Sequence, residues 1–528
     1  MTRKLAGKTS SRSVGVLAIT TALVGSALTA LSAPTASAQD QLTWGACPAG
    51  VFMAPDAVCA EFQVPKDYAN PAGEQITLTM SKIPAVGQSK GVIAGNPGGP
   101  GGEALGMFAG NTGEDEFIDS RVSLPDNVRR NYDQIAVEPR GLAFGEPLTC
   151  DIAGFPTTAL QLPVPGWTRD LCNIAHPGLI DTVTTENTAR DLNEARKVLG
   201  QDKVNLYGLS YGGLLMGTYA TLFPQHTGKT LMDSSASPDM QWFDLGAERN
   251  QARHDSLEAM FQWIADHNDE YGLGTTPLQV YQRWAQRINE ETGVAAAVTP
   301  PPAQLGDLPA GLQQQAGVAL PAVNSALPPM WRLYSAFSTL VSLAPGATAT
   351  APTYQYTVGV GLYQQSSWPK VAELIRDGEL DEPTPELPED EEILEDIAKQ
   401  SLTYGPVERA IICNENKNPV RPEKILPNTV DTWTGGDQIG INEDAFTSGQ
   451  LCAGWPLPTP AMALSGEGLE TKPLHVGFTN DSAVTPRGAS DMQRAMGGEL
   501  VLVEGHSHGV IVNDRDAVAD KVNSYFGV

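Results

Sequence analysis

The chain has 528 residues, of which 41% are hydrophobic, and carries a formal net charge of −27 at pH 7. This length is ample for one large core or for two or three domains. Because acidic residues outnumber basic ones, no basic patch is expected that could neutralise phosphates, and binding to nucleic acid is not expected.

The first 38 residues have the composition of a secretory signal. Four basic residues precede an apolar run over residues 14–31, and Ala36 and Ala38 follow in a small-x-small cleavage pattern. A transmembrane anchor is the alternative, but Thr, Ser and Gly interrupt the run and no stop-transfer pattern follows. We therefore predict cleavage after about Ala38 and an extracellular, unanchored protein whose remaining chain carries about −31.

Six cysteines follow the predicted signal. In an oxidising compartment an even number of cysteines suggests disulfides, although the sequence alone leaves many connectivities open. No Cys-x-x-Cys or His-x-x-x-His pattern occurs, so no metal site is expected. Pairing of nearest neighbours is the expected connectivity because each pair closes one local loop: Cys47 with Cys59, Cys150 with Cys172, and Cys413 with Cys452.

Strand and helix signals alternate in the first half of the chain, after a loop-rich lead-in over residues 39–75. A helical apolar face ending at Gly200 predicts a helix over residues 185–199. Strands alternating with helices are typical of an α/β protein with a parallel sheet. Apolar or alternating runs predict strands at residues 76–80, 91–94, 132–137, 204–207 and 229–233.

The pattern changes after about residue 240. Apolar residues at helical spacing predict helices over residues 245–292, and the Ala-, Pro-, Gln- and Gly-rich residues 293–330 are expected to be a flexible crossing. Strand signals return at residues 474–478 and 500–503. The sheet domain is therefore predicted to be split: residues 39–239 form its first part, 240–405 a mostly helical cap insertion, and 406–528 its second part.

Residues 204–222 carry the strongest catalytic signal. A Gly-x-Ser-x-Gly pattern centred on Ser210 follows an apolar strand and precedes a helix. A nucleophile elbow has this context, because its serine lies on a strained strand-to-helix turn and small residues nearby let the backbone come close. The first N–H groups of the helix then point at the place where an oxyanion forms. We predict that Ser210 is the nucleophile of a serine hydrolase.

An activated serine needs a base, and the base needs an orienting acid. In an α/β-hydrolase the acid and then the histidine follow the serine, each after a strand. Either His506 or His508 could be the base, and His508 is favoured. Asp481, just past the strand at 474–478, is favoured as the acid. Asp233 is the alternative, and it could instead bond backbone N–H groups in the turn that it begins.

A Gly-rich loop at residues 95–102 follows a predicted strand. Phosphate binding is one interpretation, but the loop lacks the Gly-Lys-Ser/Thr ending of a P-loop, and Pro97 and Pro100 remove two donors. The better interpretation is that the loop forms a rigid turn beside the nucleophile elbow. We predict that the N–H groups of Gly99 and Tyr211 form the oxyanion hole, where each donor can be worth roughly 3–4 kcal/mol.

Together these motifs resemble the secreted actinobacterial tripeptidyl and prolyl aminopeptidase group of α/β-hydrolase serine peptidases. The resemblance runs through most of the chain after the signal. The loop from Asp481 to Pro486 is one residue longer than is usual in the family. The matching motifs are Asn-Pro-Gly-Gly-Pro-Gly at 96–101, Glu-Pro-Arg-Gly at 138–141, the helix-and-elbow block at 191–212, Ala-Ile-Ile-Cys at 410–413, Cys-Ala-Gly-Trp-Pro at 452–456, Thr-Pro at 485–486 and His-Gly at 508–509.

The resemblance implies an α/β-hydrolase fold with a helical cap, Ser210, Asp481 and His508 as triad, and peptide substrates with free N-termini. In the family, acids in or near the cap hold the substrate's α-ammonium, and Glu415 is the candidate here. No cofactor is required. The expected function is an extracellular serine exopeptidase that releases short peptides, with tripeptides favoured. The alternatives are a secreted esterase or lipase acting on acyl esters of the cell envelope, and a catalytically silent wall-associated binding protein.

Overall fold

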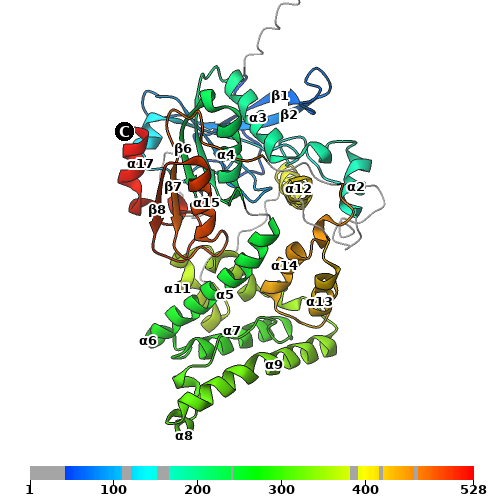
Figure 1. Ribbon diagram of the computed structural model, residues 1–528, viewed down its shortest axis with the longest axis vertical. Coiled ribbons are helices and arrows are strands. Elements are labelled where there is room, and N and C mark those ends of the chain that lie inside the picture. The colour runs from blue at the N-terminus through cyan, green and yellow to red at the C-terminus, as the bar shows by residue number, and fades with distance from the viewer. Residues whose placement is uncertain are drawn as a thin grey trace, which may run out of the picture. The chain divides into compact units, whose positions relative to one another are not determined.

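An eight-stranded sheet forms the centre of the fold, in the order β1-β2-β4-β3-β5-β6-β7-β8 (Figure 1). β2 is antiparallel to both of its neighbours, β1 and β4, whereas β4, β3, β5, β6, β7 and β8 run parallel to one another. This confirms the predicted α/β-hydrolase fold. The strands are β1 (Val58–Pro65), β2 (Gln75–Ile83), β3 (Val92–Asn96), β4 (Asp133–Val137), β5 (Val204–Leu209), β6 (Thr227–Asp233), β7 (Leu474–Phe478) and β8 (Glu499–Val503).

The structure is a computed structural model. It describes residues 42–109, 121–150, 166–239, 242–380, 390–415, 420–456 and 462–528. The predicted signal and its cleavage site lie outside these residues. Gln41–Val528 forms one compact unit. Among the helices in the described ranges, none has both the length and the apolar character needed to cross a membrane.

The central strands are buried on both faces, as expected for parallel strands covered by helices. All five residues of β3 and of β7 are buried. The helix predicted over residues 185–199 is present as α3 (Thr185–Val198). The Thr184 side chain caps its N-terminus by accepting a hydrogen bond from the N–H of Asn187.

Residues 39–75 were expected to be rich in loops, but β1 lies within them. Its buried and exposed positions alternate, with Phe62 and Val64 in the core. The Phe-x-Val spacing that produces this alternation is present in the sequence, but it spans too few residues to be distinguished from a loop before its pairing with β2 is known.

A set of helices lies between β6 and β7 in the sequence and has a hydrophobic cluster of its own (Figure 1). Met260, Phe261 and Trp284 are fully buried in that cluster. Two other clusters cover the opposite faces of the sheet. The longer helices are α5 (Trp242–Asp266), α7 (Pro277–Thr292), α9 (Ala316–Ser342), α11 (Trp368–Asp377), α12 (Glu391–Glu415), α13 (Pro422–Trp433) and α14 (Gln438–Thr447).

α9 is a second correction, because its first half was expected to be a flexible crossing. Three prolines lie inside it, and proline in a helix interior removes a backbone hydrogen bond. Its Leu320, Val323 and Leu327 nevertheless pack against the cap cluster, and such tertiary packing can outweigh local propensity. The predicted boundaries of the cap stay a prediction, and the one at residue 405 falls inside α12.

The three disulfides are those predicted from nearest-neighbour pairing: Cys47–Cys59, Cys150–Cys172 and Cys413–Cys452. The last of these ties α12 to the short 3₁₀ turn at Gln450–Cys452. Disulfides of this kind persist in oxidising compartments, so they fit an extracellular protein.

Candidate active site

Ser210 lies on a sharp turn between β5 and α4 (Tyr211–Leu222). Its backbone has φ 61° and ψ −125°, a conformation that is uncommon for a residue with a side chain. A Cβ on Gly208 would lie 2.3 Å from the carbonyl oxygen of Gly212, and one on Gly212 would lie 2.2 Å from that of Asn96. The two glycines of the motif are therefore required sterically, and the turn presents the Ser210 side chain at the carboxyl end of the sheet.

The Gly-rich loop after β3 passes beside this turn. The Asn96 side chain accepts a hydrogen bond of 3.0 Å from the N–H of Gly98, which commits that donor to the loop. Gly99 lines the same cavity as Ser210. Tyr211 is the first residue of α4, so its N–H belongs to the helix N-terminus, where donors lack intrahelical acceptors. The structure thus places Gly99 and Tyr211, the residues predicted to form the oxyanion hole, in one cavity with the serine.

His508 and Asp481 form a hydrogen-bonded pair. His508 Nδ1 lies 2.8 Å from Asp481 Oδ2, and the two side chains are 9% and 2% exposed. Asp481 Oδ1 accepts from the N–H groups of Ala483 and Val484 at 2.8 and 2.9 Å. Since Nδ1 faces a carboxylate, it is the ring nitrogen that carries the proton in neutral His508, and Nε2 is left as an acceptor.

Two opposing effects act on the pKa of His508. Burial lowers that pKa, because it disfavours the imidazolium, while the charge and hydrogen bond of Asp481 raise it. The Asp233 carboxylate raises it further, and the net result is a pKa above the ordinary value. A base with a raised pKa accepts the serine proton more readily than an isolated imidazole.

Asp233, the alternative acid, has a different place. Its Oδ1 accepts from the N–H of Val510 at 2.7 Å, and its Oδ2 accepts from the N–H of Ile511 at 2.9 Å and from the hydroxyl of Tyr207 at 3.0 Å. Burial raises the pKa of Asp233 to about 6 despite these hydrogen bonds. Asp233 therefore holds the chain just after His508, while Asp481 contacts the imidazole itself.

His506, the other late histidine, points elsewhere. The centroid of its ring lies 5.6 Å from that of Trp368. Its backbone N–H donates to the side-chain oxygen of Gln365. Burial lowers the pKa of His506. His508, in contrast, lines the cavity together with Ser210.

This cavity has a volume of about 560 Å³ and lies between the sheet and the cap helices. Ser210, His508, Gly99 and Tyr211 line it on the side of the sheet. Three helices contribute charged side chains of both signs to the cavity: Arg249 and Arg253 on α5, Glu408 and Arg409 on α12, and Glu443 on α14.

Glu415 does not belong to the described lining of this cavity. One of its carboxylate oxygens accepts from the N–H of Thr185, and the other accepts from the Thr185 hydroxyl at 2.8 Å. Burial raises the pKa of Glu415 to about 7. Because both oxygens serve the start of α3, the structure does not bring the predicted amine-binding residue to the site.

Glu408 is the acid on α12 that does line the cavity. It lies seven residues, or about two helical turns, before Glu415, and therefore on nearly the same helix face. Burial raises the pKa of Glu408, although the Arg249 and Arg409 cations pull it down. Sequence reasoning missed Glu408 because the motif used as a guide was Cys413, which is tied to Cys452 outside the cavity.

Glu443 already has partners within the cavity. Its carboxylate accepts hydrogen bonds of 2.8–2.9 Å from Arg249 and one of 2.8 Å from Arg253. The Arg253 guanidinium also donates to the hydroxyl of Tyr363 at 3.2 Å, and the backbone carbonyl of Tyr363 accepts from the N–H of His508 at 2.9 Å. These contacts connect α5 and α14 to the loop that carries His508.

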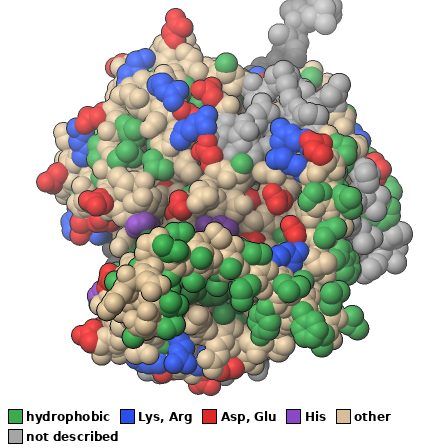
Figure 2. Space-filling view, turned by 60° about the horizontal axis from the view of Figure 1, so that its bottom comes forward, with side chains coloured by type: hydrophobic (Ala, Val, Ile, Leu, Met, Phe, Trp, Pro, Cys, Tyr) green, Lys and Arg blue, Asp and Glu red, His purple; other side chains and the backbone are tan. Residues whose placement is uncertain are grey.

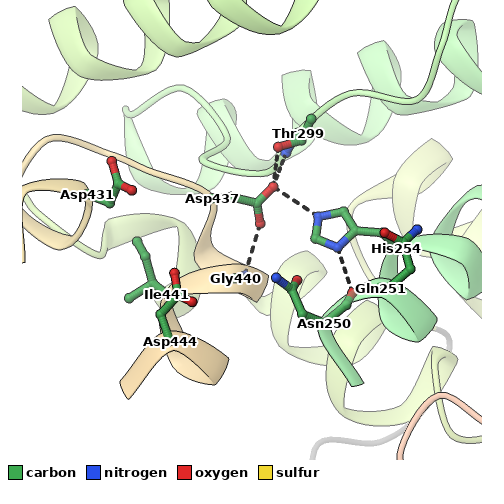
Figure 3. Close-up of a pocket in the computed structure, with 9 residues that line it drawn as sticks. All are labelled: Asn250, Gln251, His254, Thr299, Asp431, Asp437, Gly440, Ile441 and Asp444. Carbon is green, nitrogen blue, oxygen red and sulfur yellow. Dashed lines mark hydrogen bonds and ion pairs between the residues drawn. The ribbon is translucent and has the colours of Figure 1, made fainter. Parts of the chain in front are cut away.

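His254 fixes α5 to the start of α14 beside a second cavity of about 410 Å³ (Figure 3). Its Nδ1 faces the carbonyl oxygen of Asn250 at 2.9 Å and its Nε2 faces Asp437 Oδ2 at 3.0 Å. Asp437 also caps α14 through the N–H groups of Ile439 and Gly440. Since both ring nitrogens face acceptors, the imidazolium is favoured. Burial lowers the pKa of His254, but Asp437 raises it more.

We expect His254→Asn to lower the free energy of unfolding by about 1–2 kcal/mol at pH 5.5 and by less at pH 8.5. The raised pKa of His254 means that its contribution is complete below the ordinary pKa of about 6.5 and is lost as the pH rises through the folded-state value. The pKa of Asp437 is lowered, so its contribution is lost only as the pH falls below about 4.

Thermal unfolding of wild type and variant at both pH values measures this difference. His226→Asn is the control, because the His226 ring faces the backbone carbonyl of Asp202 and no carboxylate among the described residues. An equal destabilisation by His254→Asn at the two pH values would contradict the assignment of a protonated His254.

Two family models match the chain. One, described as alpha/beta hydrolase fold, matches residues 96–293, and the other, described as TAP-like protein, matches residues 438–527. The first range contains the Gly-rich loop and Ser210, and the second contains Asp481 and His508.

Similar proteins are found among well-described enzymes. The tripeptidyl aminopeptidase of Streptomyces coelicolor is 27% identical over 93% of this chain and 84% of its own. Serine protease Hip1 of Mycobacterium tuberculosis is 25% identical over 89% of this chain and 85% of its own. Carboxylesterase B of the same organism is 23% identical, with 92% and 88% covered.

Three observations point to the same class of enzyme: the order of strands in the sheet, the sharp turn at Ser210 and the similarity to known hydrolases over nearly the whole chain. The chain is a serine hydrolase with the α/β-hydrolase fold, and over most of its length it is similar to the tripeptidyl aminopeptidase group of serine peptidases.

Proposed function

We propose that this serine peptidase is an extracellular exopeptidase that removes short peptides, tripeptides in the first instance, from free N-termini. The observation that carries the proposal is one cavity lined by Ser210, by His508 and by a partly buried acid on α12, Glu408. An exopeptidase needs a carboxylate at a fixed distance from its nucleophile, because the substrate is recognised by its α-ammonium group. The similarity to a tripeptidyl aminopeptidase supports the expected length of the released peptide.

In the proposed reaction, Ser210 Oγ attacks the scissile carbonyl while His508 Nε2 takes the hydroxyl proton. Asp481 keeps the Nδ1–H tautomer in place and stabilises the imidazolium that forms. His508 then gives the proton to the leaving amine, which departs and leaves an acyl-enzyme on Ser210. Water, deprotonated by His508, hydrolyses this ester and restores the serine.

The oxyanion of each tetrahedral intermediate is held by the N–H groups of Gly99 and Tyr211. Both belong to rigid backbone, since Gly99 is in a tight turn with φ 106° and Tyr211 begins a helix. Donors that are fixed before the reaction need no reorganisation when charge develops on the oxygen. No metal or organic cofactor takes part in this sequence of steps.

Glu408 takes the place first predicted for Glu415, as the carboxylate that binds the α-ammonium. Its partial burial makes an ion pair with the substrate stronger than one at the surface. The Arg249 guanidinium is bonded to Glu443 at 2.8 Å, and the charges of Arg249 and Arg409 favour the ionised form of Glu408 that a substrate ammonium requires. A cavity lined by charged side chains of both signs is a poor environment for a long acyl chain, so peptides are favoured over lipid esters.

Paired substrates test the exopeptidase proposal. We expect hydrolysis of tripeptidyl anilides with a free amine and little hydrolysis of the same anilides after N-acetylation. A digest of a peptide library, read by mass spectrometry, then gives the end that is attacked, the length released and the side-chain preference. Activity on acyl esters without activity on free tripeptidyl anilides would contradict the proposal in favour of an esterase.

Glu408→Gln tests the amine site. We expect KM for a free tripeptidyl anilide to rise by about 10–100-fold, because a charge-assisted hydrogen bond is worth roughly 1.5–3 kcal/mol. Cleavage of a small acyl ester that lacks an amine should be unchanged. Glu395→Gln, on the exposed part of the same helix, is the matched control. Equal losses on the free anilide and on the ester would mean that Glu408 supports the cavity without binding the amine.

A further inference from the structure

The surface of α9 is unusual for a protein of this charge. Six large hydrophobic side chains on it are between 60% and 74% exposed. They recur at helical spacing and so form one stripe along the helix. The residues of this stripe are Met330, Leu333, Tyr334, Phe337, Leu340 and Val341.

The opposite side of α9 is anchored to the rest of the cap. Trp331 Nε1 donates to the carbonyl oxygen of Ala296 at 3.1 Å, and the Ser338 hydroxyl accepts from the N–H of Ala295 at 2.8 Å. The helix is therefore fixed in orientation. Its apolar stripe stays at the surface because the inner face is already occupied. Figure 2 shows hydrophobic side chains gathered in one broad area over this part of the molecule.

The stripe is large enough for a specific interface. At about 200 Å² for a large side chain, six residues with these exposures present roughly 800 Å². The largest apolar patch on a typical monomer is about 300–600 Å², whereas one partner in a stable complex buries about 800 Å². Trp433 and Leu426 on the neighbouring α13 are also well exposed and extend the apolar surface.

The charge of the chain restricts what can cover this surface. The protein has 61 acidic residues, but α9 has none over its 27 residues, and its one cation, Arg332, is paired with Asp431 at 2.7 Å. Two strongly acidic molecules repel each other through most of their surfaces. Repulsion between two such molecules is weakest where the facing surfaces carry no acidic side chains.

A lipid surface is the competing occupant. Helices that lie on membranes carry Lys and Arg beside their apolar face, and α9 offers no such cations. A net charge of −27 is also repelled by anionic lipids. The mixture of Met, Tyr, Phe and Leu with an absence of Lys, Glu and Asp is instead typical of the core of a protein–protein interface.

We infer that α9 is the interface of a homodimer, in which the stripe packs against the same stripe of a second copy about a two-fold axis. Such an isologous contact needs a self-complementary surface, and an apolar stripe without charged side chains meets this requirement. None of the described residues that line the active-site cavity lies on α9, so the dimer leaves the cavity open. The inference does not depend on the proposed substrate.

Sedimentation velocity of the purified protein over about 1–100 μM tests the dimer. We expect twice the mass of one chain for the wild type. Phe337→Glu, near the middle of the stripe, places two carboxylates close to the axis and should raise the dissociation constant by about 100-fold or more. Val86→Glu changes a side chain of comparable exposure away from the cap and should leave the dimer intact.

Near-ultraviolet circular dichroism and labelling of Ser210 by a fluorophosphonate confirm that both variants are folded. A single-chain mass for the wild type at every concentration would overturn the inference, as would dimers of equal strength in both variants. Co-sedimentation of a monomeric wild type with phosphatidylcholine vesicles, lost in Phe337→Glu, would overturn it in favour of the lipid surface.

Discussion

Replacement of Ser210 by alanine is expected to lower kcat on a free tripeptidyl anilide by about 10⁶-fold, because loss of the nucleophile in a serine peptidase leaves only binding and the oxyanion hole. KM should change little, since the hydroxyl contributes to attack and not to recognition of the amine. The melting temperature should be unchanged or slightly higher, because the hydroxyl is not part of a cap for α4. Fluorophosphonate labelling should be lost completely.

Ser89→Ala is the matched control for this experiment. Ser89 is exposed and donates only to the carbonyl oxygen of Gly91, so that variant should keep both activity and labelling. Wild-type protein that neither hydrolyses the anilide nor reacts with the fluorophosphonate would support a catalytically silent binding protein. Labelling that survives in Ser210→Ala would show that a different serine is the nucleophile.

The elbow could be predicted from the sequence because the residues that mark it are close together in the chain. Gly208, Ser210 and Gly212 are within five residues, and the strand and helix on either side have clear apolar patterns. The steric reason for both glycines lies in backbone contacts of that same segment and of β3. Such short-range constraints leave a pattern that one sequence can reveal.

The acid was harder to predict because the answer depends on which loops meet. Asp233 ends β6 and Asp481 lies shortly after β7, and these two strands are neighbours in the sheet, so both carboxylates approach His508. Only the hydrogen-bond partners distinguish them. The extra residue in the loop after Asp481 is accommodated by a turn in which Ser482 donates to the carbonyl oxygen of Leu362 at 2.6 Å, a contact across 120 residues that no sequence pattern indicates.

The position of the proposed amine-binding acid depends on long-range contacts in the same way. Glu408 and Glu415 lie on one helix, and the sequence does not show which turn of α12 reaches the cavity. That choice is made by long-range contacts, namely the bond of Glu415 to Thr185 and the disulfide at Cys413. The helical state of residues 316–330 was missed for a related reason, because packing against the cap outweighs the local effect of three prolines.

Asp481→Asn is expected to lower kcat by about 10⁴-fold while the fold is kept. Asn can still accept from the N–H groups of Ala483 and Val484 through its oxygen, so the turn should persist. Its NH₂ group then faces His508 Nδ1 as a donor. The imidazole is forced to carry its proton on Nε2, and it can no longer accept the proton of Ser210.

The pH profile separates this effect from simple damage to the site. His508 must be neutral to act as a base, and its raised pKa places the acidic limb of kcat/KM above about 6.5 in the wild type. Without the Asp481 charge, burial lowers the pKa of His508 with only Asp233 to oppose it. The residual activity of Asp481→Asn should therefore extend to lower pH than that of the wild type.

Asp233→Asn provides the comparison that decides between the two acids. It disturbs the hydrogen bonds to Val510 and Ile511 and should destabilise the loop that carries His508. We expect a lower melting temperature and a loss of activity of about 10-fold, since the Asp481–His508 bond remains. A loss in Asp233→Asn that exceeds the loss in Asp481→Asn, with no downward shift of the acidic limb in Asp481→Asn, would reverse the roles of the two carboxylates.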